Sequence, residues 1–323
     1  MSCISDVEID QELLKSVLLK ASETADEYVL SLMLEVAGLN YTNHHHINNE
    51  ALFMEALRRL REFGSTNWVQ LIWRLRDLRD LILSLSKENA AEFLGALVFV
   101  QNVDFHVEEL LEPIAEAYPE LVLEFFRKRI DHEDKSKGYE SIPFDLHDLK
   151  APLSNHASLI VRTVRSWYDV NDHLFQFRGA KLVANIYPNF SSELEEQLIS
   201  LVQSGERSDA LFVLDILRNY QGQPFLHLVC REIVSLHFPD KKLMTGVYIV
   251  LASTGVVRGE YGMAEAYSRK ADEIEYWLDD QDKHVREFAK SHIETLKIDE
   301  KLERERAQES IELRKHRYGA TDD

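Results

Sequence analysis

A pattern of six residues recurs 110 positions further along this chain. The first copy is Trp167, Asp169, Asp172, Phe175, Gln176 and Gly179, and the second is Trp277, Asp279, Asp282, Val285, Arg286 and Ala289. The shared pattern is an aromatic residue, two acids, and then an apolar residue followed four positions later by a small one. This order is typical of two helices joined by a turn. We expect Asp172 and Asp282 to cap the helices that follow them. Gly179 and Ala289 would let two helix axes approach closely.

Helical spacing of apolar residues continues through almost the whole chain, and strand-like alternation is nearly absent. Glycine and proline are scarce, and Pro119 stands where proline opens a helix. The sequence therefore predicts an all-α fold, a HEAT-like α-solenoid of roughly sixteen helices. After the middle of the chain we expect helices at roughly 157–168, 172–186, 192–203, 206–220, 224–237, 240–254, 262–278 and 282–296.

One segment interrupts this rhythm. Residues 131–155 combine a run of charged side chains with Pro143 and Pro152, and a connection of this length is unusual inside a packed helical array. We therefore expect two lobes, at 1–130 and 157–298, joined by an interlobe loop at 131–156. Residues 299–323 are predicted to form a separate charged helix and tail, which would cap the array or project from it.

Charge and cysteine content limit the functional classes. The chain has 37 Lys and Arg against 56 Asp and Glu, a net charge of -19, which repels phosphate backbones and anionic lipid at long range. Nucleic acid is therefore a disfavoured partner. Only Cys3 and Cys230 are present, so a reducing cytoplasm is the expected location. No apolar run approaches the roughly 20 residues that span a bilayer, so we expect no membrane partner.

Three stretches carry a resemblance to a known family. They are 139–144 (Tyr-Glu-Ser-Ile-Pro-Phe) after the basic triplet 127–129, residues 282–289, and the charged tail 303–315. Together they resemble the C-terminal helical region of bacterial STAND-type (NACHT-like) ATPases, many of which act in defence against phage. The glycine-rich loop of an ATPase motor is absent from this sequence. The resemblance implies a helical binding arm without its motor, acting alone or beside a separately encoded partner.

The leading functional hypothesis is a non-enzymatic scaffold or sensor that binds a protein partner. Affinity on a solenoid surface usually depends on a few aromatic and arginine anchors, and we expect these at Trp68, Trp73, Arg58, Arg74 and Arg79. The first alternative uses the arginines differently. Residues 58–79 hold six arginines on two consecutive predicted helices, and if these stack into a ridge they could bind a nucleic-acid backbone.

The second alternative is a hydrolase with its site in the interlobe loop. His147 stands between Asp145 and Asp148, and His156 follows nine positions later, so a general base could be placed there. Turn capping is the simpler role for these residues. Two further patterns are weaker still. His44, His45 and His46 lack other ligands for a metal, and Asp131, Glu133 and Lys135 lack the strands that a nuclease site needs. We therefore expect no catalytic residue, no metal site and no cofactor.

Overall fold

The computed structural model describes residues 11–44, 47–73, 78–133, 138–169 and 173–319. Within these residues all regular structure is helical, comprising seventeen α-helices and three short 3-10 helices, and no strand occurs. The prediction of an all-α helical-repeat fold is confirmed. The chain divides into two compact units, Met1–Thr163 and Val164–Asp323.

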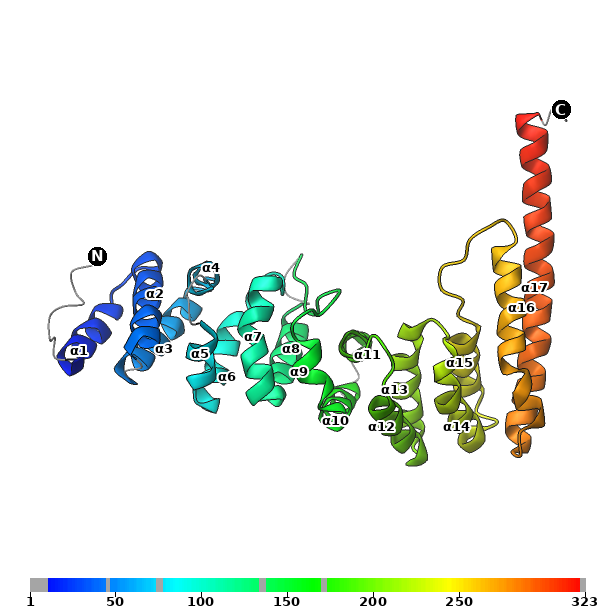
Figure 1. Cartoon of the computed structure of the whole chain (residues 1–323), viewed down its shortest axis with the longest axis horizontal. Coiled ribbons are helices and arrows are strands. Elements are labelled where there is room, and N and C mark those ends of the chain that lie inside the picture. The colour runs from blue at the N-terminus through cyan, green and yellow to red at the C-terminus, as the bar shows by residue number, and fades with distance from the viewer. Residues whose placement is uncertain (1–10, 45–46, 74–77, 134–137, 170–172, 320–323) are drawn as a thin grey trace. The chain divides into compact units, whose positions relative to one another are not determined.

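In unit 1 helices α2 and α3 and helices α7 and α8 pack as neighbouring pairs, and further contacts join helices two or three positions apart in the chain. Helix α3 contacts α6, α6 contacts α8, and α5 contacts α7 (Figure 1). Ser86 and Asp104 cap α6 and α7, each accepting a hydrogen bond from a backbone N–H three residues on. The helices are α1 (Gln11–Ser22), α2 (Glu27–His44), α3 (Ile47–Glu62), α4 (Trp68–Ile72), α5 (Leu78–Ser84), α6 (Lys87–Leu97), α7 (Phe105–Ala117), α8 (Pro119–Glu133) and α9 (Lys150–Ser154).

Unit 2 shows a regular repeat. Helices α11, α13 and α15 begin at residues 173, 207 and 241, two steps of 34, and pack in sequence against one another. Helices α12 and α14 begin 35 residues apart and form the neighbouring layer. Helix α10 (Ala157–Tyr168) spans the division. The others are α11 (His173–Ile186), α12 (Ser192–Gln203), α13 (Arg207–Leu217), η1 (Arg218–Tyr220), η2 (Pro224–Leu226), α14 (His227–His237), α15 (Lys241–Ala252), α16 (Gly262–Ile274), η3 (Glu275–Asp279) and α17 (Lys283–Tyr318).

The structure bears out most of the 110-residue self-match. Helices α11 and α17 begin at residues 173 and 283, the same 110 positions apart. Asp282 caps α17, its side chain accepting from the backbone N–H of His284 at 2.8 Å. A Cβ placed on Gly179 would lie 2.8 Å from Cγ1 of Val164, so the predicted close helix contact is confirmed. Ala289 is fully buried. The predicted cap Asp172 lies outside the described residues.

The predicted interlobe loop differs from what the structure contains. Residues 131–133 complete α8 and residues 150–154 form α9, while the division between units falls later, between Thr163 and Val164. The described part of the segment supplies core residues, since Ile142, Leu146 and Leu153 have no exposed surface. Apolar residues at irregular spacing thus pack into unit 1 without forming a long helix, and periodicity could not reveal them.

Arg129 anchors the segment that follows α8. Its guanidinium is fully buried and donates to six backbone carbonyls, those of Leu97, Val98, Val100, Gln101, Glu140 and Ser141. The guanidinium carbon also lies 4.3 Å from the ring centroid of Tyr139 and 5.5 Å from that of Phe125. One side chain therefore joins the end of α6, the body of α8 and the segment that follows it.

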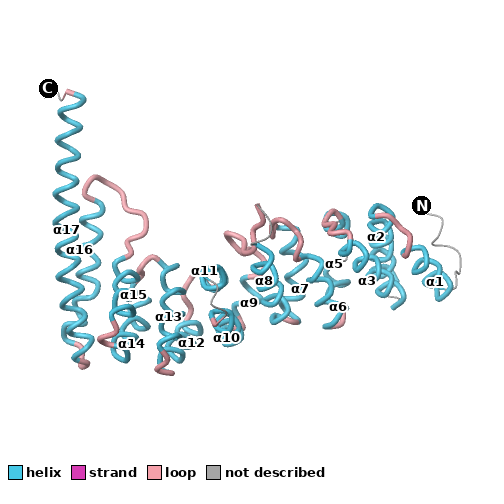
Figure 2. Tube along the Cα trace, turned by 180° about the vertical axis from the view of Figure 1, so that it is seen from behind, coloured by secondary structure: helices cyan, strands magenta, loops and turns pink. Residues whose placement is uncertain are grey.

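The C-terminal boundary predicted at residue 299 is wrong. Helix α17 continues without a break from Lys283 to Tyr318 and packs beside α16 (Figure 1). A loop over residues 253–261 leads into α16 (Figure 2), and Tyr261 at its end donates to Gln308 of α17 at 2.7 Å. The expected pair between Arg304 and Glu300 is present at 2.9 Å. No helix in the described part of the chain combines the length and apolar content needed to cross a membrane.

Candidate partner-binding surface

Two of the predicted anchors, Trp73 and Arg79, lie along one face of α7. The Trp73 ring meets Phe105 edge-on with centroids 6.4 Å apart and His106 at 4.2 Å, and its indole N–H donates to Glu109. Arg79 pairs with Glu112 at 2.7 Å and with Glu116 at 2.5 Å. Positions 105, 109, 112 and 116 share one face of a helix. We call Trp73, Arg79, Phe105 and His106 the α7 patch.

The α7 patch offers an aromatic surface to a partner. The Phe105 side chain is 53% exposed at the first turn of α7, and Arg79 is also exposed. Trp73 is half-buried. Aromatic residues and arginine are the residue types enriched at the centre of protein interfaces.

Trp68 was predicted as a surface anchor, and this is wrong. Its side chain has no exposed surface, meets Phe93 edge-on at 5.8 Å between centroids, and donates its indole N–H to the backbone carbonyl of Ser65. Trp68 is on the apolar face of its helix, and packing against Phe93 buries its ring completely. It holds α4 against α6 and is unavailable to a partner.

Three arginines of the predicted ridge, Arg58, Arg59 and Arg79, pair with acids of the same or a neighbouring helix. Arg58 of α3 forms a fork with Glu92 of α6, with nitrogen to oxygen distances of 3.2 and 3.1 Å, and also contacts Glu55. Arg59 pairs with Glu55 as well. Arg74 lies outside the described residues. Phosphate recognition by Arg58 or Arg79 would require a phosphate to displace carboxylates already in place.

These pairs belong to a recurring arrangement. A basic residue pairs with an acid 33 or 34 positions later at Arg58 and Glu92, Arg79 and Glu112, Lys87 and Glu120, and Arg207 and Asp240. The interval is close to the 34-residue step of unit 2, and each pair joins two elements that pack against one another in the array. Opposite charges about one repeat apart are visible in the sequence, although helical periodicity alone does not reveal them.

The interlobe histidines have different acidic neighbours. The ring of His147 is 72% exposed and lies 3.9 Å from Asp145. His156 lies instead near Glu120, where its charge adds to that of Lys87 in lowering the pKa of this carboxyl. The buried carboxylate of Glu108 accepts from the backbone N–H groups of His147 and Asp148 at 2.7 and 2.9 Å, and burial raises the pKa of Glu108. This turn is therefore capped mainly by Glu108 of α7, whereas turn capping was expected from the loop residues; of these, Asp145 accepts from the backbone N–H of Leu146 at 3.0 Å.

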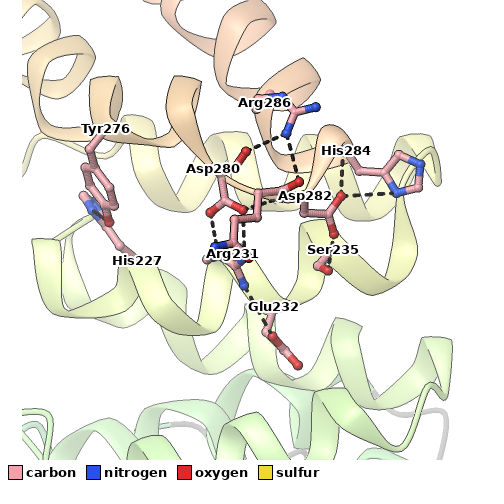
Figure 3. A network of polar contacts seen from close by, with 10 residues as sticks. His227, Arg231, Glu232, Ser235, Tyr276, Asp280, Asp282, His284 and Arg286 are labelled. Atoms are coloured by element: carbon pink, nitrogen blue, oxygen red, sulfur yellow. Dashed lines mark hydrogen bonds and ion pairs between the residues drawn. The ribbon is translucent and has the colours of Figure 1, made fainter.

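A polar network joins α14 to η3 and the start of α17 in unit 2 (Figure 3). Arg231 donates to both carboxylate oxygens of Asp280, at 2.7 and 2.8 Å. Ser235 donates to Asp282, the cap of α17. Arg286 closes the turn by donating to the carbonyls of Asp280 and Gln281 at 2.6 and 2.9 Å. These side chains therefore find their hydrogen-bond partners within the network, which forms a structural joint between repeats.

The charges at this joint are stabilised by their partners. The hydrogen bond from Arg231 lowers the pKa of Asp280, and the hydrogen bond from Ser235 lowers the pKa of Asp282. His227, whose ring stacks on Tyr276 (Figure 3), is buried, and burial lowers its pKa. The joint is thus built from ionised carboxylates and a neutral imidazole.

Below the joint, the core contains polar groups without partners. His292 is 2% exposed, and neither ring nitrogen has a hydrogen-bond partner among the described residues. Its ring stacks on Phe288 at 5.5 Å and meets Tyr248 edge-on at 4.9 Å. Burial lowers the pKa of His292 to about 4. The indole N–H of Trp277 is likewise unpaired in this part of the structure.

Two candidate sites depend on residues that the structure leaves undescribed. Of the histidine triplet, His45 and His46 lie outside the described residues, and Lys135 of the acid and lysine set does too. Among the residues that are described, no group of three or more His, Cys, Asp or Glu side chains is placed to hold a metal ion.

Comparison with known proteins adds little. No family model and no curated protein matches the chain. Among solved structures, the crystal structure of an engineered protein is similar at 15% sequence identity and a TM-score of 0.37, covering 87% of this chain and 78% of that one. A likeness at this level carries no argument about activity.

Proposed function

We propose that this chain is a non-enzymatic helical-repeat scaffold that binds a protein partner. The observation that carries the proposal is the α7 patch, where an exposed Phe105 and a half-buried Trp73 pack together at the start of α7 and Arg79 lies further along the same helix. The arginine is already oriented by Glu112 and Glu116, so little side-chain freedom is lost when a partner binds. A partner that places an apolar side chain against Phe105 and Trp73 fits this surface.

The proposal extends to a cellular setting. We place the protein in the cytoplasm, as a binding arm in a bacterial defence or regulatory system, acting alone or beside a separately encoded partner. The support is the resemblance of residues 139–144, 282–289 and 303–315 to the helical region of STAND-type ATPases, together with only two cysteines in 323 residues.

The test is capture of partners from the native cell with the tagged full chain. We expect Phe105→Ala to lose a protein that the unchanged chain retains, because the aromatic anchor is removed. Phe63→Ala is the matched control, since Phe63 is 58% exposed and lies in the turn after α3, outside the α7 patch. Retention that is equal for Phe105→Ala and Phe63→Ala would exclude the α7 patch as the binding surface.

A further inference from the structure

A groove runs between α15 and α17 in unit 2. Its floor consists of Phe238, Met244, Tyr248, Phe288 and His292, and its rim of Thr245, Glu287, Ser291 and Thr295. The cavity has a volume of about 430 Å³. We call it the α15–α17 groove. It belongs to neither the α7 patch nor the polar joint, although His284 of the joint stacks on Phe238 at its base, with centroids 5.1 Å apart.

Apolar surface continues beyond the groove along α17. Ile298 is 59% exposed and Leu302 is 46% exposed, and they follow Ser291 and Thr295 on the same helix face at intervals of three and four residues. Asp299, next to Ile298, accepts a hydrogen bond from Tyr248 at 2.7 Å, so this level of α17 is still beside α15. The surface is elongated along the helix and favours an extended occupant over a compact small molecule.

The acids beside the groove indicate the charge of what would cover it. His292 lines the groove through its ring, and its two nitrogens are themselves buried. Glu287 and Glu294, on the outer edge of the same face of α17, form no ion pair within the described chain. The arginines of unit 1 contrast with them, since Arg58 and Arg79 are both paired.

We propose that the α15–α17 groove binds an amphipathic helix of a partner protein, with its apolar side chains in the groove and lysine or arginine residues facing Glu287 and Glu294. From Glu287 to Leu302 the surface is about 22 Å long, which matches a helix of about 15 residues. Apolar side chains at intervals of three and four residues would lie over Phe288, Met244 and Tyr248.

The test uses the purified full chain and labelled synthetic helices of about 15 residues, followed by fluorescence anisotropy. One peptide carries leucine on one face and lysine elsewhere, a second replaces lysine by glutamate, and a third scrambles the first. We expect the cationic amphipathic peptide to bind best. Ser291→Trp fills the groove and should weaken its binding by about tenfold. Ser310→Trp is the matched control, an exposed serine on the same helix and away from the groove.

Variants that remove single charges distinguish binding in the groove from general attraction to an acidic protein. Glu287→Gln with Glu294→Gln should weaken binding and reduce its salt dependence, whereas Glu309→Gln should do neither. Equal binding to the unchanged chain and Ser291→Trp, or no preference over the scrambled peptide, overturns the proposal. Phe105→Ala should leave peptide binding unchanged, so failure of the groove and failure of the α7 patch can be told apart.

Discussion

Two arginines join helices in this protein by different means. Arg129 in unit 1 is fully buried and donates to six backbone carbonyls, whereas Arg231 in unit 2 is partly exposed and forks onto the carboxylate of Asp280. Carbonyls belong to the backbone, so Arg129 can hold a segment that has no regular structure. A carboxylate belongs to one side chain, so the Arg231 pair links two elements at a single point and does not order the backbone around it. The difference explains why the irregular segment after α8 is part of the core.

The largest expected effect tests this contrast directly. Replacing Arg129 by Met should lower the free energy of unfolding by about 4 kcal/mol, because buried carbonyls lose their donors and the cation no longer stacks between Phe125 and Tyr139. Chemical denaturation measures this loss. Lys128→Met is the control, since Lys128 is half-exposed and should change little. A loss below 1 kcal/mol for Arg129→Met would mean that the segment after α8 stays packed without Arg129.

The two regions should also differ in pH dependence. Arginine does not titrate in this range, so the Arg129 contacts are constant. His292 is different, because burial lowers its folded pKa to about 4, below an unfolded value of about 6.5. Its neutral form therefore favours folding fully above pH 6.5, and that stability is lost as the pH falls towards 4. The loss can reach about 3 kcal/mol.

Unfolding experiments between about pH 7 and pH 4 measure this effect. We expect stability to fall across the interval, with a contribution of the same sign from His227. The variant His292→Phe keeps an aromatic ring against Phe288 and Tyr248 and should flatten the profile. An equally steep profile in His292→Phe would show that other groups, such as carboxylates gaining protons, control the acid transition.

A smaller effect is expected at the Arg231 pair. Arg231→Met should cost about 1.5 kcal/mol, because the pair is partly solvated and water can replace the fork. Since the pKa of Asp280 is lowered by this hydrogen bond, the contribution is present above the unfolded carboxyl pKa and disappears as the pH falls through the folded value. A double-mutant cycle with Asp280→Asn isolates the pair. A cost as large as that of Arg129→Met would remove the contrast between the two arginines.

The cap of α17 contributes less. Asp282→Ala removes the acceptor for the backbone N–H of His284 and for Ser235, and should cost about 1 kcal/mol. Asp282→Asn keeps an acceptor and should recover most of that loss. Thermal unfolding distinguishes the three proteins, and a destabilisation by Asn equal to that by Ala would indicate that charge and not capping matters here.

The sequence predicted what depends on local rules. The start of α8 at Pro119, the cap at Asp282 and the close contact at Gly179 follow from backbone geometry, and all three are observed. Contacts made across the repeat were missed, because Arg129 and its carbonyls are distant in sequence and leave no periodic signal. Trp68 was misplaced for a related reason, since helical spacing gives one apolar face and only packing decides how deeply a ring is buried.

Site prediction was limited in the same way. Trp73 and Arg79 were chosen by residue type, and the structure places both along α7 with Phe105, which the sequence did not single out. The α15–α17 groove was also missed, because its floor combines residues from α15, α17 and the turn before α15. Such a surface arises from the space between two helices and has no motif of its own.

The smallest expected effect concerns nucleic acid. We expect no tight binding of duplex DNA at about 0.15 M salt, and no change on replacing Arg58 and Arg79 by Ala, because both side chains are already bound to glutamates of the next repeat. Each phosphate neutralised contributes about 0.9 to the log–log salt slope, and paired arginines release few counterions. Filter binding over a salt series measures the slope. Sub-micromolar affinity that disappears in the double variant would show that DNA displaces Glu92 and Glu112. The ion pairs between repeats would then open to bind a ligand and would not be purely structural.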